Sequence, residues 1–195
     1  YNSLSLINWK AIEYEQDDIS RITLALSNYY RTSLNKGKNT LMLEQEISNV
    51  RSYIEIQQIM HDNSFNVDID ISSDILKVES LNLILQPLVE NAIDHGIDLL
   101  TDRRGVITIK GSRRSYVNTA NENIDIVCLS VSDNGVGMDE NICKSFLTAE
   151  SKGYGARNVN DRIRLFYGEE YHLEVKSIVG TGTTITIKFP VRLME

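Results

Sequence analysis

The sequence is poor in cysteine and proline and has no long apolar run. Its two cysteines, Cys128 and Cys143, stand 15 positions apart, form no metal-ligand cluster and are typical of unpaired thiols in a reducing compartment. No stretch approaches 18 uninterrupted apolar residues, so we expect no membrane-spanning helix. The first residues do not have the basic, apolar, small-residue order of a signal peptide. We therefore expect a cytoplasmic location.

The chain also has fewer basic residues than acidic ones. Lys and Arg number 20 against 27 Asp and Glu, which gives a net charge of -7. This acidity argues against general binding to nucleic acid or to an anionic membrane surface, so we expect neither contact from this chain. The 195 residues are 42% hydrophobic, which is enough for a real core.

Glycine is scarce in one half of the chain only. Gly37 is the single glycine before residue 96, and the other ten of the 11 glycines follow from there on. Glycine is used where the backbone needs positive φ or must approach another group closely. The asymmetry predicts a helical first part and a second part with specialised loops.

Helical periodicity runs through the first 60 residues. Apolar residues recur at helical spacing over 4–11 and 19–30, and the polar segment 13–18 between them is short enough to turn one helix back on the other. A third helix is expected over 43–59. So short a helix pair cannot bury its apolar face alone. It either packs on its own chain or dimerises into a four-helix bundle.

From Phe65 the period changes. Alternation predicts a strand over 65–71, further strands over 106–110 and 124–132, and a hairpin of 173–178 with 183–189; helices are expected over 81–95 and 156–167. This order predicts an α+β fold, a two-layer α/β sandwich in which helices cover one face of a mixed sheet. We divide the chain into a helical segment, 1–62, and a second domain, 63–195.

The segment 85–96 (Leu-Gln-Pro-Leu-Val-Glu-Asn-Ala-Ile-Asp-His-Gly) carries polar side chains at helical spacing. Two pairs stand four residues apart and share one face: Glu90 with Asp94, and Asn91 with His95. Carboxylate and amide oxygens suit Mg²⁺ together with its phosphate ligands. The alternative is an amphipathic helix whose polar side is merely solvated.

Three glycine motifs follow. Ser132–Met138 (Ser-Asp-Asn-Gly-Val-Gly-Met) comes directly after a strand, and Asp133 there can accept a hydrogen bond from a base amine, although such a motif is commonly only a turn. Lys152–Asn158 contains Gly-x-Gly at the start of a helix, where backbone amides favour phosphate. Gly180–Thr183 (Gly-Thr-Gly-Thr), taken alone, is a hairpin loop.

In this order and spacing, the four motifs resemble the GHKL (Bergerat) ATP-binding fold of histidine kinases, type II topoisomerases and certain serine kinases. They are similar to its N box, two glycine boxes and final Gly-Thr box. The segments 85–96 and 155–168 resemble the LytS-type sensor histidine kinases almost letter for letter. The segments 30–34 and 43–57 are similar to the linker region of that family, so the resemblance covers nearly the whole chain.

The resemblance implies a function. It implies binding of ATP and Mg²⁺ and transfer of the γ-phosphoryl group to a histidine, for relay to a response regulator protein. It also implies a homodimer through the N-terminal helices of the full-length protein. The alternatives are a GHKL serine kinase that antagonises a sigma factor, and a degenerate nucleotide-binding scaffold for signalling.

The resemblance also implies roles for individual residues. Asn91 would hold Mg²⁺, Glu90 would be the acid–base or metal-orienting carboxylate, and His95 would lie near the phosphates. Asp94 would face the same phosphates, at a position where the family often has a basic or neutral residue. Asp133 would accept from the adenine amine, in a base pocket lined by Gly135, Gly137 and Met138, with Thr183 close to it. The phosphate loop would comprise Lys152, Gly153, Tyr154, Gly155 and Ala156, after a short lid over 139–152.

The sequence departs from the family at its first residues. The family's phosphoacceptor lies in a Pro-His-Phe-Leu-(Tyr/Phe)-Asn motif, and the chain begins with Tyr1 and Asn2, the last two letters of that motif. We therefore expect the soluble part of a longer membrane-anchored receptor that binds Mg²⁺-ATP but cannot phosphorylate itself at the family's site. Asn2 would lie one helical turn after the missing histidine, and we consider it a candidate catalytic residue in dephosphorylation of the regulator.

Overall fold

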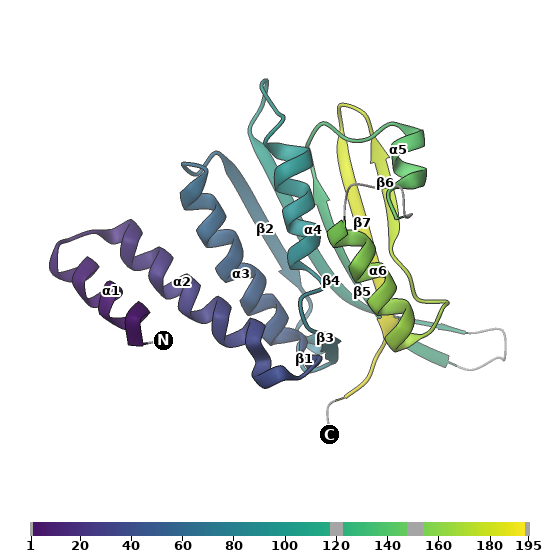
Figure 1. The fold of residues 1–195 in the computed structure, drawn as a ribbon. Coiled ribbons are helices and arrows are strands. Elements are labelled where there is room, and N and C mark those ends of the chain that lie inside the picture. Colours follow the sequence, from purple (N-terminus) through teal and green to yellow (C-terminus); the bar gives the residue numbers. More distant parts are fainter. Residues whose placement is uncertain (1, 118–122, 148–153, 194–195) are drawn as a thin grey trace.

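The computed structural model describes residues 2–117, 123–147 and 154–193 (Figure 1). The α-helices are α1 (Asn2–Glu13), α2 (Asp17–Leu34), α3 (Leu43–Met60), α4 (Gln86–Asn91), α5 (Glu140–Ser145) and α6 (Tyr154–Tyr167). The strands are β1 (Thr40–Met42), β2 (Phe65–Ile71), β3 (Glu79–Leu81), β4 (Gly105–Val117), β5 (Asn123–Asp133), β6 (Glu174–Ile178) and β7 (Gly182–Pro190). The shorter turns are η1 (Asn35–Gly37), η2 (Ser73–Ile75) and the π-helix η3 (Ala92–Ile97). No helix among the described residues combines the length and apolarity needed to cross a bilayer.

One mixed sheet organises the larger part of the chain. Its strand order is β2-β4-β5-β7-β6, in which β2 runs parallel to β4 and every other neighbouring pair is antiparallel. Helices α3, α4 and α6 lie side by side over one face of this sheet, with α2 beside α3 and α1 outermost (Figure 1). The predicted α+β fold, a two-layer sandwich preceded by a helical hairpin, is therefore confirmed.

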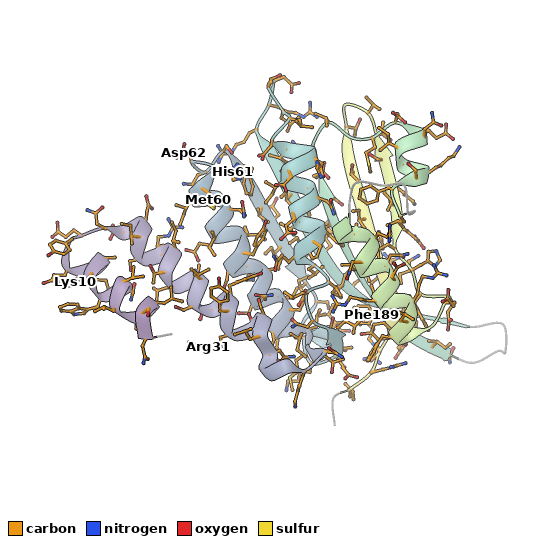
Figure 2. The ribbon with its side chains drawn as sticks, in the orientation of Figure 1. Lys10, Arg31, Met60, His61, Asp62 and Phe189 are labelled. Carbon is orange, nitrogen blue, oxygen red and sulfur yellow. The ribbon has the colours of Figure 1, made fainter. Side chains whose placement is uncertain are left out.

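The core lies between the sheet and the three helices that cover it. Alternate strand residues point into this layer and are almost completely buried, as their spacing predicts: Ile107, Ile109, Val127, Leu129, Ile185, Ile187 and Phe189. Phe189 stacks on Tyr167 of α6, with ring centroids 4.9 Å apart (Figure 2). Burying a side chain of this kind contributes about 1.5–3 kcal/mol, so this layer supplies most of the stability of the fold.

Helices α1 and α2 are much less buried. Ala11 is the buried residue of α1, and α2 buries Thr23 and Ala25. Large apolar side chains on these helices remain exposed, including Leu6, Ile7, Trp9, Ile12 and Leu24. Figure 2 shows Lys10 at the outer end of the helical layer, well away from the buried core residue Phe189. Of the two arrangements left open by the sequence, α2 packs on its own chain along α3, while α1 keeps an uncovered apolar face.

The helix expected over 81–95 is displaced. Residues 79–81 form strand β3, which pairs with β1, and the helix begins only at Gln86 before continuing as the π-helix η3 to Ile97. The cause is a turn at residues 82–85, where Leu83 has a left-handed φ of 56° that no α-helix permits. Helical periodicity does not reveal such a turn, because its apolar side chains Ile84 and Leu85 are buried just as helix residues would be.

Strand β4 is longer than predicted. It runs to Val117 rather than Lys110, and beyond Gly111 it pairs with β5 alone, up to Val117 opposite Asn123. The polar run Ser112–Ser115 lacks the apolar alternation that marks a half-buried strand, and cross-strand pairing makes it a strand nonetheless. A second unpredicted element is α5, whose first amides bond to the Asp139 side chain.

Candidate functional site

A cavity lies between α4, η3 and the ends of β5 and β7. Three of the four sequence motifs line it, together with apolar residues of the core: Leu88, Asn91, Ala92, His95, Gly96, Val131, Asp133, Met138, Phe146, Thr183 and Ile185. The fold thus brings together segments that are about 50 residues apart along the chain. The walls are mainly apolar and polar groups are few, which is the usual character of a small-molecule site.

Asp133 is the carboxylate of this cavity. It is the last residue of β5, and its Oδ1 accepts hydrogen bonds from the backbone N–H of Gly135 (2.8 Å) and of Thr183 (3.3 Å). Burial raises the pKa of Asp133, while these amides act in the opposite direction. The amides fix one carboxylate oxygen to the backbone, so the group is held as a directed acceptor at the cavity wall.

The loop after Asp133 needs its two glycines for different reasons. A Cβ on Gly135 would lie 2.4 Å from Cα of Gly96, so only a glycine allows the loop to pack directly on the end of η3. Gly137 has a φ of +68°, and its Cβ would lie 2.1 Å from the carbonyl oxygen of Ile178. The loop is therefore pressed between η3 and the β6–β7 turn.

The polar face of α4 and η3 borders the other end of the cavity. The Asn91 side-chain nitrogen donates to the carbonyl of Pro87 (2.7 Å), and Gln86 Nε2 donates to Glu90 Oε1 (2.6 Å). With its nitrogen committed to Pro87, Asn91 has its amide oxygen available as a ligand atom. Glu90 is half-buried, whereas Asp94 and His95 are exposed, although His95 still lines the cavity.

Helix α6 begins beside the same face. Gly155 lies in its first turn, and a Cβ there would contact Cβ of Pro87 at 3.2 Å, so α6 packs closely against the first turn of α4. Ala156 is fully buried. Of the expected phosphate loop, Lys152 and Gly153 lie outside the described residues, as does the side chain of Tyr154.

Comparison with known proteins gives a consistent result. The family described as histidine kinase-, DNA gyrase B- and HSP90-like ATPases matches residues 77–193, and the histidine kinase family matches residues 1–65. The sensor histidine kinase YesM of Bacillus subtilis (strain 168) is 33% identical over 192 residues, which are 98% of this chain and 31% of YesM. The sensor protein LytS of Streptococcus agalactiae is 31% identical over 203 residues, which cover 100% of this chain and 32% of LytS.

The chain belongs to the LytS-type histidine kinases of this ATPase family. It spans about a third of the length of these curated relatives. The histidine kinase domain of the blue-light activated histidine kinase from Erythrobacter litoralis EL346 has the same fold, with a TM-score of 0.54 at 21% identity over 96% of this chain and 85% of that one. ATP binding is the property that the GHKL fold implies.

In the terms of this kinase family, the N box, the first glycine box and the Gly-Thr box meet at one cavity, and the described part of the second glycine box lies beside it. One predicted site residue is far away. Asn2 is exposed at the start of α1, which lies beyond α2 and α3 from the sheet (Figure 1). Within this chain the structure does not bring Asn2 to the cavity, and its role in dephosphorylation stays a prediction.

Arg103 of this kinase domain is a residue of the site that the sequence motifs do not reveal. Its guanidinium donates to three backbone carbonyls, those of Asn134 (2.7 Å), Gly135 (3.1 Å) and Gly180 (3.0 Å). It therefore ties the first glycine box to the β6–β7 turn. An arginine in a polar loop gives no sequence signal for this, because these three partners are backbone carbonyls and one of them is 77 residues away. Its side-chain partner is the adjacent Asp102 (3.1 Å).

Proposed function

We propose that the chain binds Mg²⁺-ATP in this cavity and is the catalytic portion of a two-component sensor histidine kinase. It would transfer the γ-phosphoryl group to a histidine, for relay to a response regulator. The observation that carries the proposal is Asp133, a half-buried carboxylate fixed by the amides of Gly135 and Thr183 in a cavity that Asn91 also lines. One end of the cavity suits a base and the other suits phosphates.

At the base end, Asp133 would accept a hydrogen bond from the exocyclic amine of adenine. A guanine base presents a carbonyl oxygen in that position, which an ionised carboxylate repels, so the site favours ATP over GTP. Met138, an adaptable apolar side chain, and Thr183 line the same cavity and would contact the ring. Gly135 and Gly137 would permit its close approach to the backbone.

At the phosphate end, the side chains of the α4 face would supply the metal and phosphate contacts. The Asn91 amide oxygen would be the protein ligand to Mg²⁺, because Mg²⁺ takes oxygen ligands and keeps sites for phosphate and water. The described residues contain no cluster of three or more His, Cys, Asp or Glu side chains that could hold a metal alone, which fits an ion bound mostly by nucleotide. When bound, Mg²⁺ neutralises charge on the transferred phosphoryl group.

Two further residues of this face would act with Asn91. Glu90, held by Gln86, would orient the metal's water or take a proton from the attacking histidine. His95 would lie near the phosphates. Asp94 would add negative charge there, which bound Mg²⁺ and solvent would have to screen. The backbone amides at Gly155 and Ala156 would face the phosphates from the start of α6.

The partners of the proposed kinase are a second copy of the chain and a response regulator. The exposed apolar side chains of α1, among them Leu6, Ile7 and Trp9, would be covered in a homodimer of the whole protein. The acceptor histidine in such an assembly would be presented by the helices that form the dimer.

Calorimetric titration of ATP into the chain, with Mg²⁺ and with EDTA, tests the proposal. We expect wild-type protein to bind ATP more tightly with Mg²⁺. Asn91→Ala should lose about tenfold or more of that gain, because the proposed protein ligand to Mg²⁺ is removed. Its affinity for ATP without metal should be unchanged. Asn28→Ala, at an exposed position on α2, is the control and should behave as wild type. Absence of ATP binding to the wild type would refute the proposed function, and an unchanged Mg²⁺ gain in Asn91→Ala would refute the metal assignment.

A further inference from the structure

The turn that precedes the N-box helix is held by a buried side chain from α3. Glu46 is 0% exposed, and its carboxylate accepts three backbone hydrogen bonds: from Leu83 (2.9 Å), Ile84 (2.8 Å) and Leu85 (2.9 Å). These three N–H groups stand directly before Gln86, the first residue of α4. Glu46 therefore acts as an N-terminal cap of the N-box helix, supplied by a different helix.

The energetics of this contact are demanding. A buried carboxylate is tolerated only where several hydrogen bonds or a nearby cation compensate for its lost hydration. Burial raises the pKa of Glu46, and the three amides and the charge of Arg162 oppose that rise. Negative charge is also favourable at the positive end of a helix dipole. The buried Glu46 carboxylate is therefore tolerated only in this backbone geometry, in which the turn, with a left-handed φ of 56° at Leu83, presents three N–H groups to it.

Two other helices hold the same turn. From α6, Arg162 donates to the carbonyls of Leu83 (3.2 Å) and Asn82. From the end of α2, the carbonyl of Ser33 accepts from the Asn82 side-chain amide (2.8 Å). The turn at residues 82–85 is therefore a junction at which the two helices of the linker region and the helix of the second glycine box all meet the start of the N box.

We propose that Glu46 is a positioning residue for the N box: it sets where α4 begins and thereby places Asn91 and Glu90 at the phosphate end of the cavity. This inference rests on the proposed function, because it concerns the site for Mg²⁺-ATP. Asn91 is the last residue of the short helix α4 and lies only six residues beyond Leu85, so a shift or fraying of the first turn moves Asn91 directly.

The inference predicts a selective effect. The base end is held by contacts that do not include Glu46: those of Asp133 with Gly135 and Thr183, and those of Arg103 with three carbonyls. Weakening the junction should therefore impair metal and phosphate binding while adenine recognition persists. A residue with only a general structural role would lower both together, or neither once the protein is folded.

Glu46→Gln tests this, because glutamine keeps the volume but removes the charge and places an amide N–H₂ against backbone donors. Its matched control is Glu44→Gln, an exposed position in the same first turn of α3. ATP is titrated with Mg²⁺ and with EDTA. We expect Glu46→Gln to lose about 10-fold or more of the Mg²⁺-dependent gain in affinity, because changes to groups that orient metal ligands have effects of this size. Its metal-free affinity should stay close to that of the wild type.

The outcomes separate the two hypotheses. A wild-type chain that does not bind ATP removes the proposed function itself. A wild type that binds Mg²⁺-ATP, with a Glu46→Gln variant that keeps the full Mg²⁺ gain, overturns only the positioning role. Circular dichroism checks the fold. If Glu46→Gln does not fold, Arg162→Gln decides, since this partly exposed side chain holds the same turn from α6. It should show the same selective loss, and an undiminished Mg²⁺ gain there refutes the inference.

Discussion

The two ends of the cavity are built in different ways. At the base end, backbone packs on backbone: Gly135 on Gly96 and Gly137 on Ile178, with Asp133 bonded to two amides. At the phosphate end, Asn91 and Glu90 are carried on a short helix. Its start is fixed by the side chains of Glu46 from α3 and Arg162 from α6, and by a backbone carbonyl of α2.

Under the proposed function, this difference would separate a rigid recognition site from an adjustable reaction site. Backbone contacts between glycines have no rotamers to exchange, so the base end has one geometry. The phosphate end depends on contacts of the turn with Glu46 of α3, Arg162 of α6 and Ser33 of α2, and packed helices can shift by small amounts relative to one another. In a kinase, the phosphoryl group must meet an acceptor that arrives from elsewhere, and a reaction site that follows the linker helices suits that requirement.

The largest effect should come from breaking the backbone contact at the base end. Gly137→Ala puts a Cβ 2.1 Å from the Ile178 oxygen at a φ of +68°, so strain and overpacking together should cost about 3 kcal/mol and abolish measurable ATP binding. Gly180→Ala is the matched control. It has a similar φ of +76° but open space around the Cβ, so only about 1 kcal/mol should be lost. Urea unfolding and calorimetry measure both, and equal losses would show that close packing is irrelevant.

The second test concerns protonation of Asp133. Its pKa is raised by burial, so the folded chain holds this proton more tightly than the unfolded chain does. That contribution to stability is present at low pH and is lost as the pH rises through the raised pKa. In the proposed site the ionised carboxylate accepts from the adenine amine, so ATP affinity should fall as the pH decreases through the same value. This change is opposite in sign to the change in stability.

Asp133→Asn should bind ATP about 10- to 100-fold more weakly at neutral pH, because a charged acceptor is lost. Calorimetry measures the ATP affinity of both proteins from pH 7 to acidic pH. The ATP phosphates titrate in the same way with either protein, so the difference between the two profiles is the contribution of Asp133. Asp125→Asn, at the far end of β5, should keep the wild-type pH dependence. If the wild type and Asp133→Asn show the same pH profile, Asp133 does not contact the base.

The smallest effect should come from Arg103. Arg103→Ala leaves the glycine contacts in place and removes the bonds to the carbonyls of Asn134, Gly135 and Gly180, so ATP affinity should fall only about 3- to 10-fold. The neighbouring Arg104 bonds instead to Asn66 and Asn63, and Arg104→Ala should leave affinity unchanged. A loss for Arg103→Ala as large as that for Gly137→Ala would mean that side chains, not backbone, hold the base end.

Most of the fold could be predicted from sequence, because the apolar periods change where the elements change. The strand over 65–71 and the final hairpin lie where alternation places them. The start of the N-box helix could not be predicted in this way. Residues 82–85 are buried and apolar enough to be read as helix, and the contact that prevents it, from Glu46, is 37 to 39 residues away in sequence.

The site follows the same division. Asp133, Gly135 and Gly137 could be identified because each motif is local and its glycines mark close backbone contact. The same could not be done for Arg103, Glu46 and Arg162. Each of these side chains bonds to backbone atoms of a distant segment, and the residue types of that segment do not indicate the contact. Sequence patterns therefore reveal the groups that would touch the ligand, while the groups that hold them in place require the structure.

The strand order also governs when the site can form during synthesis of the chain. β7 lies between β5 and β6, and it pairs residues as distant as Ile126 and Pro190. β6 is made before β7 but has no partner in the sheet until β7 is inserted. Such long-range pairing is slow compared with hairpin formation. Thr183, which bonds to Asp133, lies on this late strand. A nascent chain therefore completes the cavity proposed for ATP only when the last strand of the sheet has been added.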